Sequence, residues 1–395
     1  MFYLVFQRKL LEELRKWVGT RNIIVVTGMR QVGKTTLMKI LYSEIPGKNK
    51  VFLDLENPIN RKVFEEEDYD NIWANLAAFS VTKKEKAFVF LDELQRAPGI
   101  VPALKYLFDN YDVQFFVTGS SSFYLKDLFP ESLAGRKVLL EMFPLDFDEF
   151  LLFKGFPREC NSIAEKSQAK NNVVFERNTK HYSEFLEYGG FPKVVLAADK
   201  EEKYAALDDI FTSYFEKDVR TLADFADLAK LRDFILLLMQ RSGSKLNVAR
   251  LASELSVARP TVYSYLSFLE ATYFISLVTQ FSLNRDREVR SARKVYLCDT
   301  GILNRFARVS SGVILENAVF NVLRSFGEVN YYETRSGSET DFIVGKATAL
   351  EVKETGTEHD LRKTRAIAEK LALTDSFVVS KNFVQAPGFI CASDL

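Results

Sequence analysis

The residues best suited to chemistry lie at 28–36 (GMRQVGKTT), where the spacing is Gly-x-x-x-x-Gly-Lys-Thr. The two glycines let the backbone wrap closely around an anion, so that successive N–H groups point at a phosphate. The lysine supplies a mobile positive charge for the β- and γ-phosphates, and the threonine hydroxyl that follows it is placed to bind Mg²⁺. We therefore predict a phosphate-binding P-loop for Mg-ATP, built from Gly28, Gly33, Lys34, Thr35 and Thr36.

This loop needs a strand before it and a helix after it. The β-branched run at 23–27 predicts the strand, and a helix is expected to begin near Lys34. The N-terminus of that helix would add the positive end of its dipole to the phosphate site. The alternative interpretation is an ordinary glycine turn between a strand and a helix.

An apolar run at 87–91 ends in two carboxylates, Asp92 and Glu93. In a sheet that contains the P-loop strand, Asp92 is expected to hold the Mg²⁺ shell, and Glu93 to polarise the attacking water as general base. The next strand ends in Thr118 and Ser120, at the edge where open α/β sheets bind ligands. Either residue is a candidate to sense the γ-phosphate or to position the water, and a simple polar turn is the alternative.

Arg136 follows in the segment 132–136 (SLAGR). It is either an ordinary surface residue or an arginine finger that reaches the γ-phosphate bound by a neighbouring subunit. The second interpretation requires a ring or a similar oligomer.

Five segments, GMRQVGKTT, FVFLDELQ, VTGSSS, ESLAGRK and MFPLDFDEFL, together resemble the AAA+ group of archaeal and bacterial predicted ATPases. Residues 188–192 (YGGFP) and 294–301 (KVYLCDTG) also resemble signatures of this group, so the resemblance covers most of the chain. It implies ATP and Mg²⁺ as cofactors, with Arg136 at the Leu-Ala-Gly-Arg position of the group. It also implies a homo-oligomer, for which a hexameric ring is one candidate.

The composition is that of a soluble globular protein of two to four domains, with 395 residues, 47% apolar and 27% charged. Lys+Arg and Asp+Glu both number 53, so DNA contacts must come from local patches, and no membrane partner is expected. Three widely spaced cysteines indicate a reduced, cytoplasmic location. The chain has two histidines, which excludes a site built from three or more histidines.

The expected fold class is α/β, because short apolar runs alternate with helical patterns in the first part of the chain. Strands are expected at 51–55, 87–91, 114–118 and 137–141, after a first helix at 7–17. Amphipathic helices are expected at 181–188, 201–221 and 226–239. The predicted domains are an AAA+ P-loop core with a parallel sheet (1–155), a helical lid (156–240), a winged helix-turn-helix (241–292) and a PD-(D/E)xK-like domain (293–395).

Residues 246–273 have the layout of a helix-turn-helix, with a first helix at 248–255 and a second that opens with Pro260. Near the start of the second helix, where such helices read DNA, lie Arg259, Thr261 and Tyr263. A β-ribbon at 274–283 and 293–297 would form the wing. The basic residues beside it are Arg285, Arg287, Arg290, Arg293 and Lys294. A packing module between domains is the alternative.

The last part of the chain predicts a helix, three strands, a helix and a strand, at 312–325, 328–333, 340–345, 348–354, 359–372 and 375–380. Asp341 followed after nine residues by Glu351-x-Lys353 resembles the PD-(D/E)xK nuclease superfamily, although no proline precedes Asp341. Asp341 and Glu351 would bind Mg²⁺, with Glu316 completing the acidic cluster. Lys353 would position the nucleophile or neutralise charge. Such domains also serve as DNA-binding or structural modules that do not cut.

These motifs favour an oligomeric ATPase that remodels, translocates on or processes DNA. One alternative is a DNA nuclease regulated by ATP. A second is a nucleotide-dependent switch that binds a protein partner; Glu93 argues against it, because a carboxylate there is best explained by efficient hydrolysis.

Overall fold

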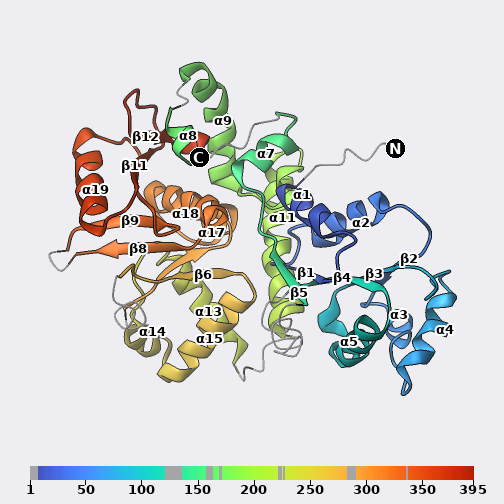
Figure 1. Ribbon diagram of the computed structural model, residues 1–395. Coiled ribbons are helices and arrows are strands. Elements are labelled where there is room, and N and C mark those ends of the chain that lie inside the picture. Colours follow the sequence, from blue (N-terminus) through green and yellow to red (C-terminus); the bar gives the residue numbers. More distant parts are fainter. Residues whose placement is uncertain are drawn as a thin grey trace. The chain divides into compact units, whose positions relative to one another are not determined.

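The computed structural model describes residues 8–120, 136–156, 163–168, 171–220, 225, 227–282, 291–334 and 337–395. The chain forms two compact units (Figure 1). Unit 1 comprises Met1–Phe143 with Ala271–Tyr273, and unit 2 comprises Pro144–Glu270 with Phe274–Leu395. Each unit contains a five-stranded sheet with helices, which confirms the α/β class. The finer division into four domains stays a prediction.

The sheet of unit 1 is entirely parallel, as predicted, and its strand order is β2-β3-β4-β1-β5. Its strands are β1 (Ile23–Thr27), β2 (Lys50–Asp54), β3 (Ala87–Asp92), β4 (Val113–Gly119) and β5 (Lys137–Glu141). Because all the carboxyl ends lie at one edge, the polar residues after β1, β3 and β4 meet there. The central place of β4, between β1 and β3, sets Thr118 between the P-loop and the acidic pair.

Helices cover both faces of this sheet (Figure 1). On one face lie α1 (Lys9–Trp17) and α2 (Lys34–Glu44), and on the other α3 (Pro58–Lys62), α4 (Ile72–Ala77) and α5 (Val101–Asn110). Strand side chains alternate between the two faces. Phe90 and Phe116 stack at 4.5 Å between ring centroids, and Tyr42 of α2 packs edge-on against Phe90. Val89 and Val117 belong to the core on the other face. This packing on both sides holds the strand ends in place.

Unit 2 begins with helices and a ribbon. Its first elements are α7 (Phe147–Phe153), α8 (Ile163–Gln168), α9 (Asn172–Tyr188), α10 (Pro192–Val195), α11 (Lys200–Ser213), a π-helical turn (Tyr214–Val219), α13 (Leu228–Met239), α14 (Val248–Leu255) and α15 (Arg259–Ala271). β6 (Ile275–Val278) and β7 (Lys294–Leu297) form an antiparallel ribbon. The helical region, the two helices of the helix-turn-helix layout and the ribbon are found where the sequence predicts them.

The second sheet lies at the end of the chain, in the order β12-β11-β10-β9-β8. Its elements are α17 (Thr300–Phe306), α18 (Ser311–Leu323), β8 (Val329–Glu333), β9 (Glu339–Val344), β10 (Thr348–Lys353), α19 (Glu358–Leu371), β11 (Asp375–Ser380) and β12 (Phe389–Cys391). β8, β9 and β10 pair antiparallel, whereas β10, β11 and β12 pair parallel. The predicted order of helix, three strands, helix and strand is confirmed, and β12 is an addition that the sequence analysis missed.

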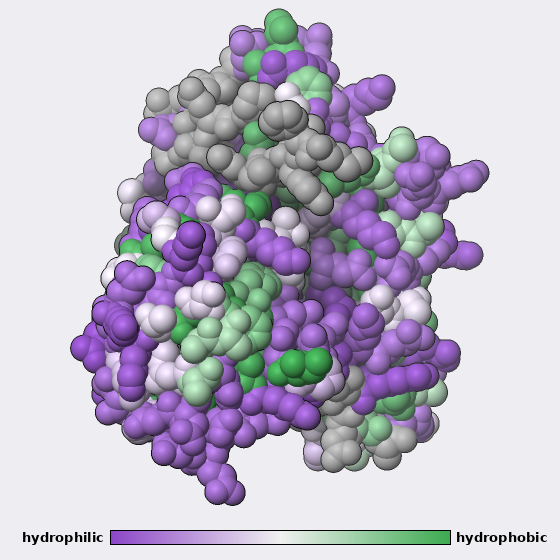
Figure 2. All heavy atoms as spheres, turned by 90° about the vertical axis from the view of Figure 1, so that its right-hand side faces the viewer, coloured by the Kyte–Doolittle hydropathy of each residue, from purple (hydrophilic) through white to green (hydrophobic). Residues whose placement is uncertain are grey.

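Figure 2 shows a face of the molecule that is mainly hydrophilic, with small apolar areas between hydrophilic side chains. Large apolar side chains that are exposed in unit 2 include Val173 and Tyr263. In the described ranges, no helix is both long enough and apolar enough to cross a membrane.

Candidate functional site

The P-loop runs from the end of β1 to the N-terminus of α2, and both of its glycines are required by geometry. Gly33 caps α2 in the left-handed region, with φ 104°. Gly28 has φ 153°, and a Cβ there would lie 2.0 Å from the carbonyl oxygen of Met142. Lys34 is buried, and its ammonium donates to the carbonyl oxygens of Gly28 (2.8 Å) and Met29 (2.9 Å). The exposed Thr36 follows on α2.

Arg8, directly before α1, stabilises the P-loop. Its guanidinium donates to the carbonyl oxygens of Val32 at 2.8 Å and Phe143 at 2.7 Å, and the residue is buried. The sequence analysis missed Arg8, because its partners are backbone atoms far along the chain. No residue pattern near Arg8 signals such contacts.

Asp92 lies between two hydroxyl groups, which brings the predicted Mg²⁺ residues together. Thr35 Oγ1 donates to Asp92 Oδ2 at 2.7 Å, and Thr118 Oγ1 donates to Asp92 Oδ1. Burial raises the pKa of Asp92, and the two hydroxyl donors oppose part of this rise. Hydroxyl and carboxylate oxygens are the hard donors that Mg²⁺ prefers, so the donor set fits this ion.

Glu93 has an uncommon backbone conformation, with φ 61° and ψ 48°. A non-glycine residue in the left-handed region is found at functional sites more often than elsewhere. The backbone N–H of Glu93 donates to Thr118 Oγ1 at 3.0 Å. Thr118 therefore orients both members of the acidic pair, a role more specific than the sensor role expected for it.

The Glu93 carboxylate faces two residues that the sequence analysis did not single out. The Gln95 amide donates to Glu93 Oε2 and, at 3.0 Å, to Ser120 Oγ. A guanidinium nitrogen of Arg30, in the P-loop, lies 4.0 Å from Glu93 Oε2, and both side chains are 14% exposed. Ser120 thus reaches the site through Gln95. The nearness of Gln95 to Asp92 and Glu93 in the sequence was a signal that could have found it.

Arg136 lies at the opposite edge of the sheet. It precedes β5, and its carbonyl oxygen accepts the N–H of Ile23, at the start of β1, at 2.8 Å. Its guanidinium forms an ion pair of 2.5 Å with Asp109, and its side chain is 46% exposed. Since a strand of this length spans about 16 Å, Arg136 cannot reach the P-loop of its own subunit.

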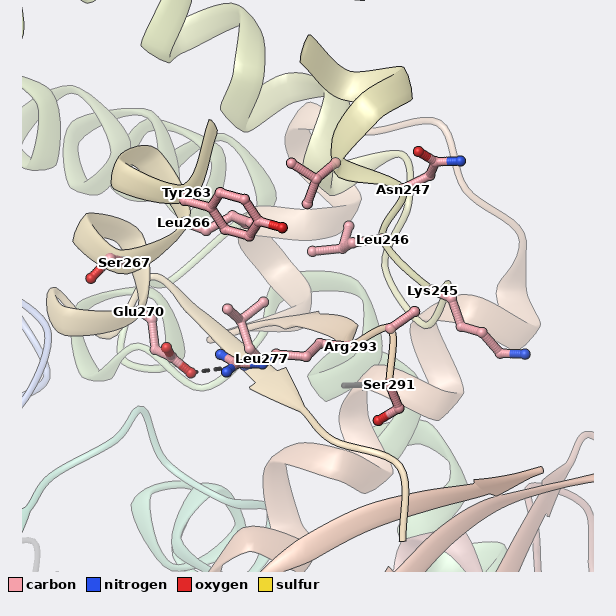
Figure 3. Close-up of a pocket in the computed structure, with 12 residues that line it drawn as sticks. Lys245, Leu246, Asn247, Tyr263, Leu266, Ser267, Glu270, Leu277, Ser291 and Arg293 are labelled. Atoms are coloured by element: carbon pink, nitrogen blue, oxygen red, sulfur yellow. Dashed lines mark hydrogen bonds between the residues drawn. The ribbon is translucent and has the colours of Figure 1, made fainter. Parts of the chain in front are cut away.

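The helix-turn-helix layout places its candidate residues on the outside of unit 2. Arg259 and Tyr263 are exposed, and Thr261 is partly exposed. Tyr263 lines a cavity of about 960 Å³ beside the β6–β7 ribbon, where Leu266 and Arg293 also lie (Figure 3). Glu270 lines the same cavity and accepts the backbone N–H of Leu277 at 3.4 Å.

The basic patch expected at the ribbon needs a correction. Arg293 is exposed, but Lys294 is buried and takes no part in a surface patch. Every side chain of β7 is buried, so the residue next to Arg293 points into the protein. Arg285, Arg287 and Arg290 lie outside the described residues.

Asp341 and Glu351 occupy neighbouring antiparallel strands, where the register pairs Leu350 with Phe342. Asp341 Oδ2 accepts the backbone N–H of Val352 at 2.8 Å. Lys353 Nζ lies 2.7 Å from Glu351 Oε1, so these two side chains share one strand face, as predicted. Lys363 of α19 lies 3.8 Å from the same oxygen.

Glu316, on α18, meets two side chains from β7. Tyr296 Oη donates to Glu316 Oε1 at 2.7 Å, and Lys294 Nζ lies 3.5 Å from the same oxygen. Burial, with the charge of Asp341 nearby, raises the pKa of Glu316 to about 7. Burial also raises the pKa values of Asp341 and Glu351. Asp341 therefore lies within electrostatic reach of both Glu316 and Glu351. In the part of the chain that the structure describes, however, no three His, Cys, Asp or Glu side chains form a group able to hold a metal ion.

The segments YGGFP and KVYLCDTG meet at Asp299. Its carboxylate caps α17 by accepting the N–H groups of Gly301 (2.8 Å) and Ile302 (3.1 Å), and it also accepts that of Gly190 (2.7 Å). A Cβ at Gly189 would lie 2.1 Å from this carboxylate. Burial raises the pKa of Asp299 to about 6. A Cβ at Gly190 would lie 2.1 Å from the carbonyl oxygen of Leu145, and one at Gly301 would lie 2.0 Å from that of Tyr188, so the glycines of both segments are structural requirements.

Comparison with known proteins agrees with the P-loop interpretation. Residues 20–151 match an AAA domain, and residues 179–312 match a domain of unknown function (DUF8612). The AAA+ part of the resemblance is therefore confirmed, and the chain is a nucleotide-binding protein of this class. The resemblance of the last domain to nucleases stays a prediction.

Relatives are found in archaea and bacteria. The uncharacterized protein MJ1544 of Methanocaldococcus jannaschii is 30% identical over 375 residues, which cover 89% of this chain and 80% of the relative. An uncharacterized protein of Haemophilus influenzae is 26% identical over 378 residues, 90% of each chain. Among solved structures, the Aeropyrum pernix ORC1 protein in complex with DNA has a TM-score of 0.30 and 14% identity, over 75% of this chain and 90% of that one. A likeness this low says nothing about function.

With its AAA domain and its extensive similarity to MJ1544, the chain belongs to the family of that protein.

Proposed function

We propose that the protein is an ATPase that binds Mg-ATP at the P-loop and hydrolyses it. The observation that carries this proposal is the position of Asp92, whose carboxylate accepts the hydroxyl groups of Thr35 and Thr118 directly before Glu93. In this arrangement Lys34 and the N-terminus of α2 hold the phosphates. Thr35 and Asp92 would hold Mg²⁺, which supplies charge neutralisation when bound.

Glu93 is the residue that we assign as general base. Its carboxylate orients the attacking water and accepts a proton from it. Gln95 and Ser120 hold this side chain from one side, and Arg30 approaches it from the P-loop. Because Arg30 also belongs to the loop that binds the phosphates, we expect nucleotide binding to alter its contact with Glu93.

The test is Mg²⁺-dependent turnover of ATP by the full chain. Glu93→Gln should retain ATP binding and lose turnover by about 10²–10⁴-fold, the usual contribution of a general base. Turnover at the wild-type rate in Glu93→Gln would overturn the assignment. Turnover too slow to distinguish wild type from Glu93→Gln would instead favour the nucleotide-dependent switch.

We further infer that Arg136 acts on a neighbouring subunit in an oligomer. What supports this is its exposed place at the edge of the sheet opposite its own P-loop. Arg136→Ala should keep ATP binding and lose turnover. A mixture of Arg136→Ala with Glu93→Gln should recover part of the activity, because mixed oligomers contain some intact sites. Full activity of Arg136→Ala alone would remove the argument for an oligomer.

We propose DNA as the macromolecule on which the ATPase acts. The support is a set of exposed residues on α15 and at the ribbon, namely Arg259, Tyr263 and Arg293. Arginine suits phosphate contacts, and an exposed aromatic ring suits base stacking. Duplex DNA should stimulate ATP turnover, and Arg259→Ala should weaken this stimulation and lower the dependence of binding on salt. The control is Arg232→Ala, at an exposed arginine that pairs with Asp233. An equal effect of both variants would remove Arg259 from the contact, and binding that does not depend on salt would favour a protein partner.

A nuclease regulated by ATP is the second candidate, and the observation that favours it is the placement of Asp341 and Glu351 on the neighbouring strands β9 and β10. Its test is Mg²⁺- or Mn²⁺-dependent cleavage of labelled duplex, flap and junction DNA by wild type and Asp341→Ala. Cutting by the wild type alone would support it. Equal cutting by both proteins would point to a contaminant.

A further inference from the structure

The buried Lys294 contacts two carboxylates of unit 2, those of Glu316 and Glu339. Only 5% of its side chain is exposed. Its ammonium lies 3.5 Å from Glu316 Oε1 and forms an ion pair with Glu339. The charge of Asp341 also acts on it. The ammonium group of Lys294, on β7, thus bridges a carboxylate from α18 and one from β9.

The backbone of β7 explains why this lysine is buried. Side chains two apart on a strand share a face, so Lys294 and Tyr296 point the same way. Both reach Glu316 Oε1. A buried ammonium is costly unless carboxylates surround it, and buried carboxylates at this spacing repel one another without a cation. The buried ammonium of Lys294 and the buried carboxylates around it therefore stabilise one another.

Two of the carboxylates that a divalent metal would use already face an ammonium group of the protein, since Lys294 lies 3.5 Å from Glu316 and Lys353 lies 2.7 Å from Glu351. Glu316 accepts from Tyr296, Asp341 accepts from the backbone of Val352, and Glu351 accepts from Lys353. Glu351 Oε2 is buried without a hydrogen-bond partner among the described residues, and it provides a single ligand atom. Mg²⁺ requires several oxygens converging at about 2.1 Å in octahedral geometry. The residues as placed do not fit a divalent ion while Lys294 occupies the cluster.

We propose that Lys294 is a built-in counter-ion that takes the place of a divalent cation, so that the last domain holds its acidic cluster together without metal and does not cut DNA. The nuclease-like residues then serve to assemble the domain. This inference is independent of ATP binding and hydrolysis in unit 1, and it argues against the nuclease candidate.

The experiment compares Mn²⁺ binding to the full chain in the absence of nucleotide, by calorimetry, for wild type and Glu351→Gln. We expect both proteins to bind the same number of ions, because the cluster takes none. One more ion bound by wild type than by Glu351→Gln would overturn the proposal. This comparison leaves Lys294 unchanged, so it does not depend on the folding of a Lys294 variant.

A second arm removes the counter-ion. Lys294→Met, which keeps the length of the side chain, should gain one Mn²⁺ and should be stabilised against thermal unfolding by Mn²⁺ relative to EDTA. The double variant with Glu351→Gln should lose both effects. Folded Lys294→Met that gains no ion would contradict the idea that the lysine takes the place of a metal. ATP turnover is measured separately, so failure here leaves the ATPase proposal intact.

Discussion

The two carboxylate clusters of this protein are held in opposite ways. In unit 1, Asp92 accepts from the neutral hydroxyl groups of Thr35 and Thr118. In unit 2, Glu316 and Glu351 contact the ammonium groups of Lys294 and Lys353. A hydroxyl donor orients a carboxylate without cancelling its charge, whereas an ammonium group neutralises it. We therefore propose that the first cluster binds a cation that arrives with the nucleotide, whereas Lys294 and Lys353 already neutralise the second.

This difference shows why carboxylates at the right spacing are not by themselves a metal site. Asp341 and Glu351 meet the residue pattern of a nuclease, and the donors around them decide what they can bind. The same holds for Asp92, where the pattern and the donors agree. The expected effects of substitutions should separate the two cases.

The largest effect is expected for the stability of unit 2 in Lys294→Met. Removing one partner of a buried ionic cluster leaves carboxylates uncompensated and should cost about 3–5 kcal/mol. Hydrogen exchange of the β9 and β10 amides in metal-free buffer measures this loss. The control is Lys346→Met, at an exposed lysine that pairs with Glu328, for which we expect a change within about 0.5 kcal/mol. Equal effects would mean that Lys294 is an ordinary ion-pair residue.

In unit 1, the P-loop lysine, Lys34, should affect ligand binding and turnover more than folding. Lys34→Ala removes the charge that holds the phosphates and should lower ATP turnover by about 10²–10³-fold. Turnover at saturating Mg²⁺ and a nucleotide-binding assay measure it. Lys39→Ala, at an exposed position on the same helix, is the matched control. A near-normal rate in Lys34→Ala would contradict the assignment of Lys34 to phosphate binding in unit 1.

A smaller effect is expected from the hydroxyl that serves both Asp92 and Glu93. Thr118→Val keeps the shape of the side chain and removes the donor to Asp92 and the acceptor for the Glu93 N–H. Because the two lost hydrogen bonds act on turnover only through the placement of Asp92 and Glu93, we expect a loss of about tenfold, close to the net value of a single hydrogen bond. Thr118→Ser keeps the hydroxyl and should stay near the wild-type rate. If both variants lose activity equally, the methyl group rather than the hydroxyl is needed.

The sequence was sufficient where local residue types determine local structure. The P-loop, the parallel sheet of unit 1 and the order of elements around β9 and β10 follow from glycine spacing, β-branched runs and period-two alternation. Arg8 and Arg30 could not be found in this way, because their partners are distant in the chain and are brought near only by folding. Lys294 was placed in a basic patch because arginines precede it in the sequence. All four residues of β7 are buried, so polar–apolar alternation gives no signal for the burial of Lys294.

A third carboxylate, Asp299, is held by backbone N–H groups, and it gives the smallest expected effect. It accepts three backbone N–H groups, from Gly190, Gly301 and Ile302. Asp299→Asn would point an N–H group toward one of these donors and should cost about 1 kcal/mol. Asp208→Asn, at a more exposed aspartate paired with Arg305, is the control.

The difference in stability between wild type and Asp299→Asn should change with pH in a defined direction. Burial raises the pKa of Asp299 to about 6 in the folded protein, above the value of about 4 in the unfolded chain. Between these values the folded state binds more protons, so this group stabilises the fold most below pH 4 and loses that contribution as the pH rises through 6. Asparagine does not titrate. The stability of wild type relative to Asp299→Asn should therefore increase as the pH falls from about 6 to about 4, measured by urea unfolding at each pH. A difference that stays constant over this range would mean that the three N–H donors, with the charge of Arg324, keep the carboxylate ionised in spite of its burial.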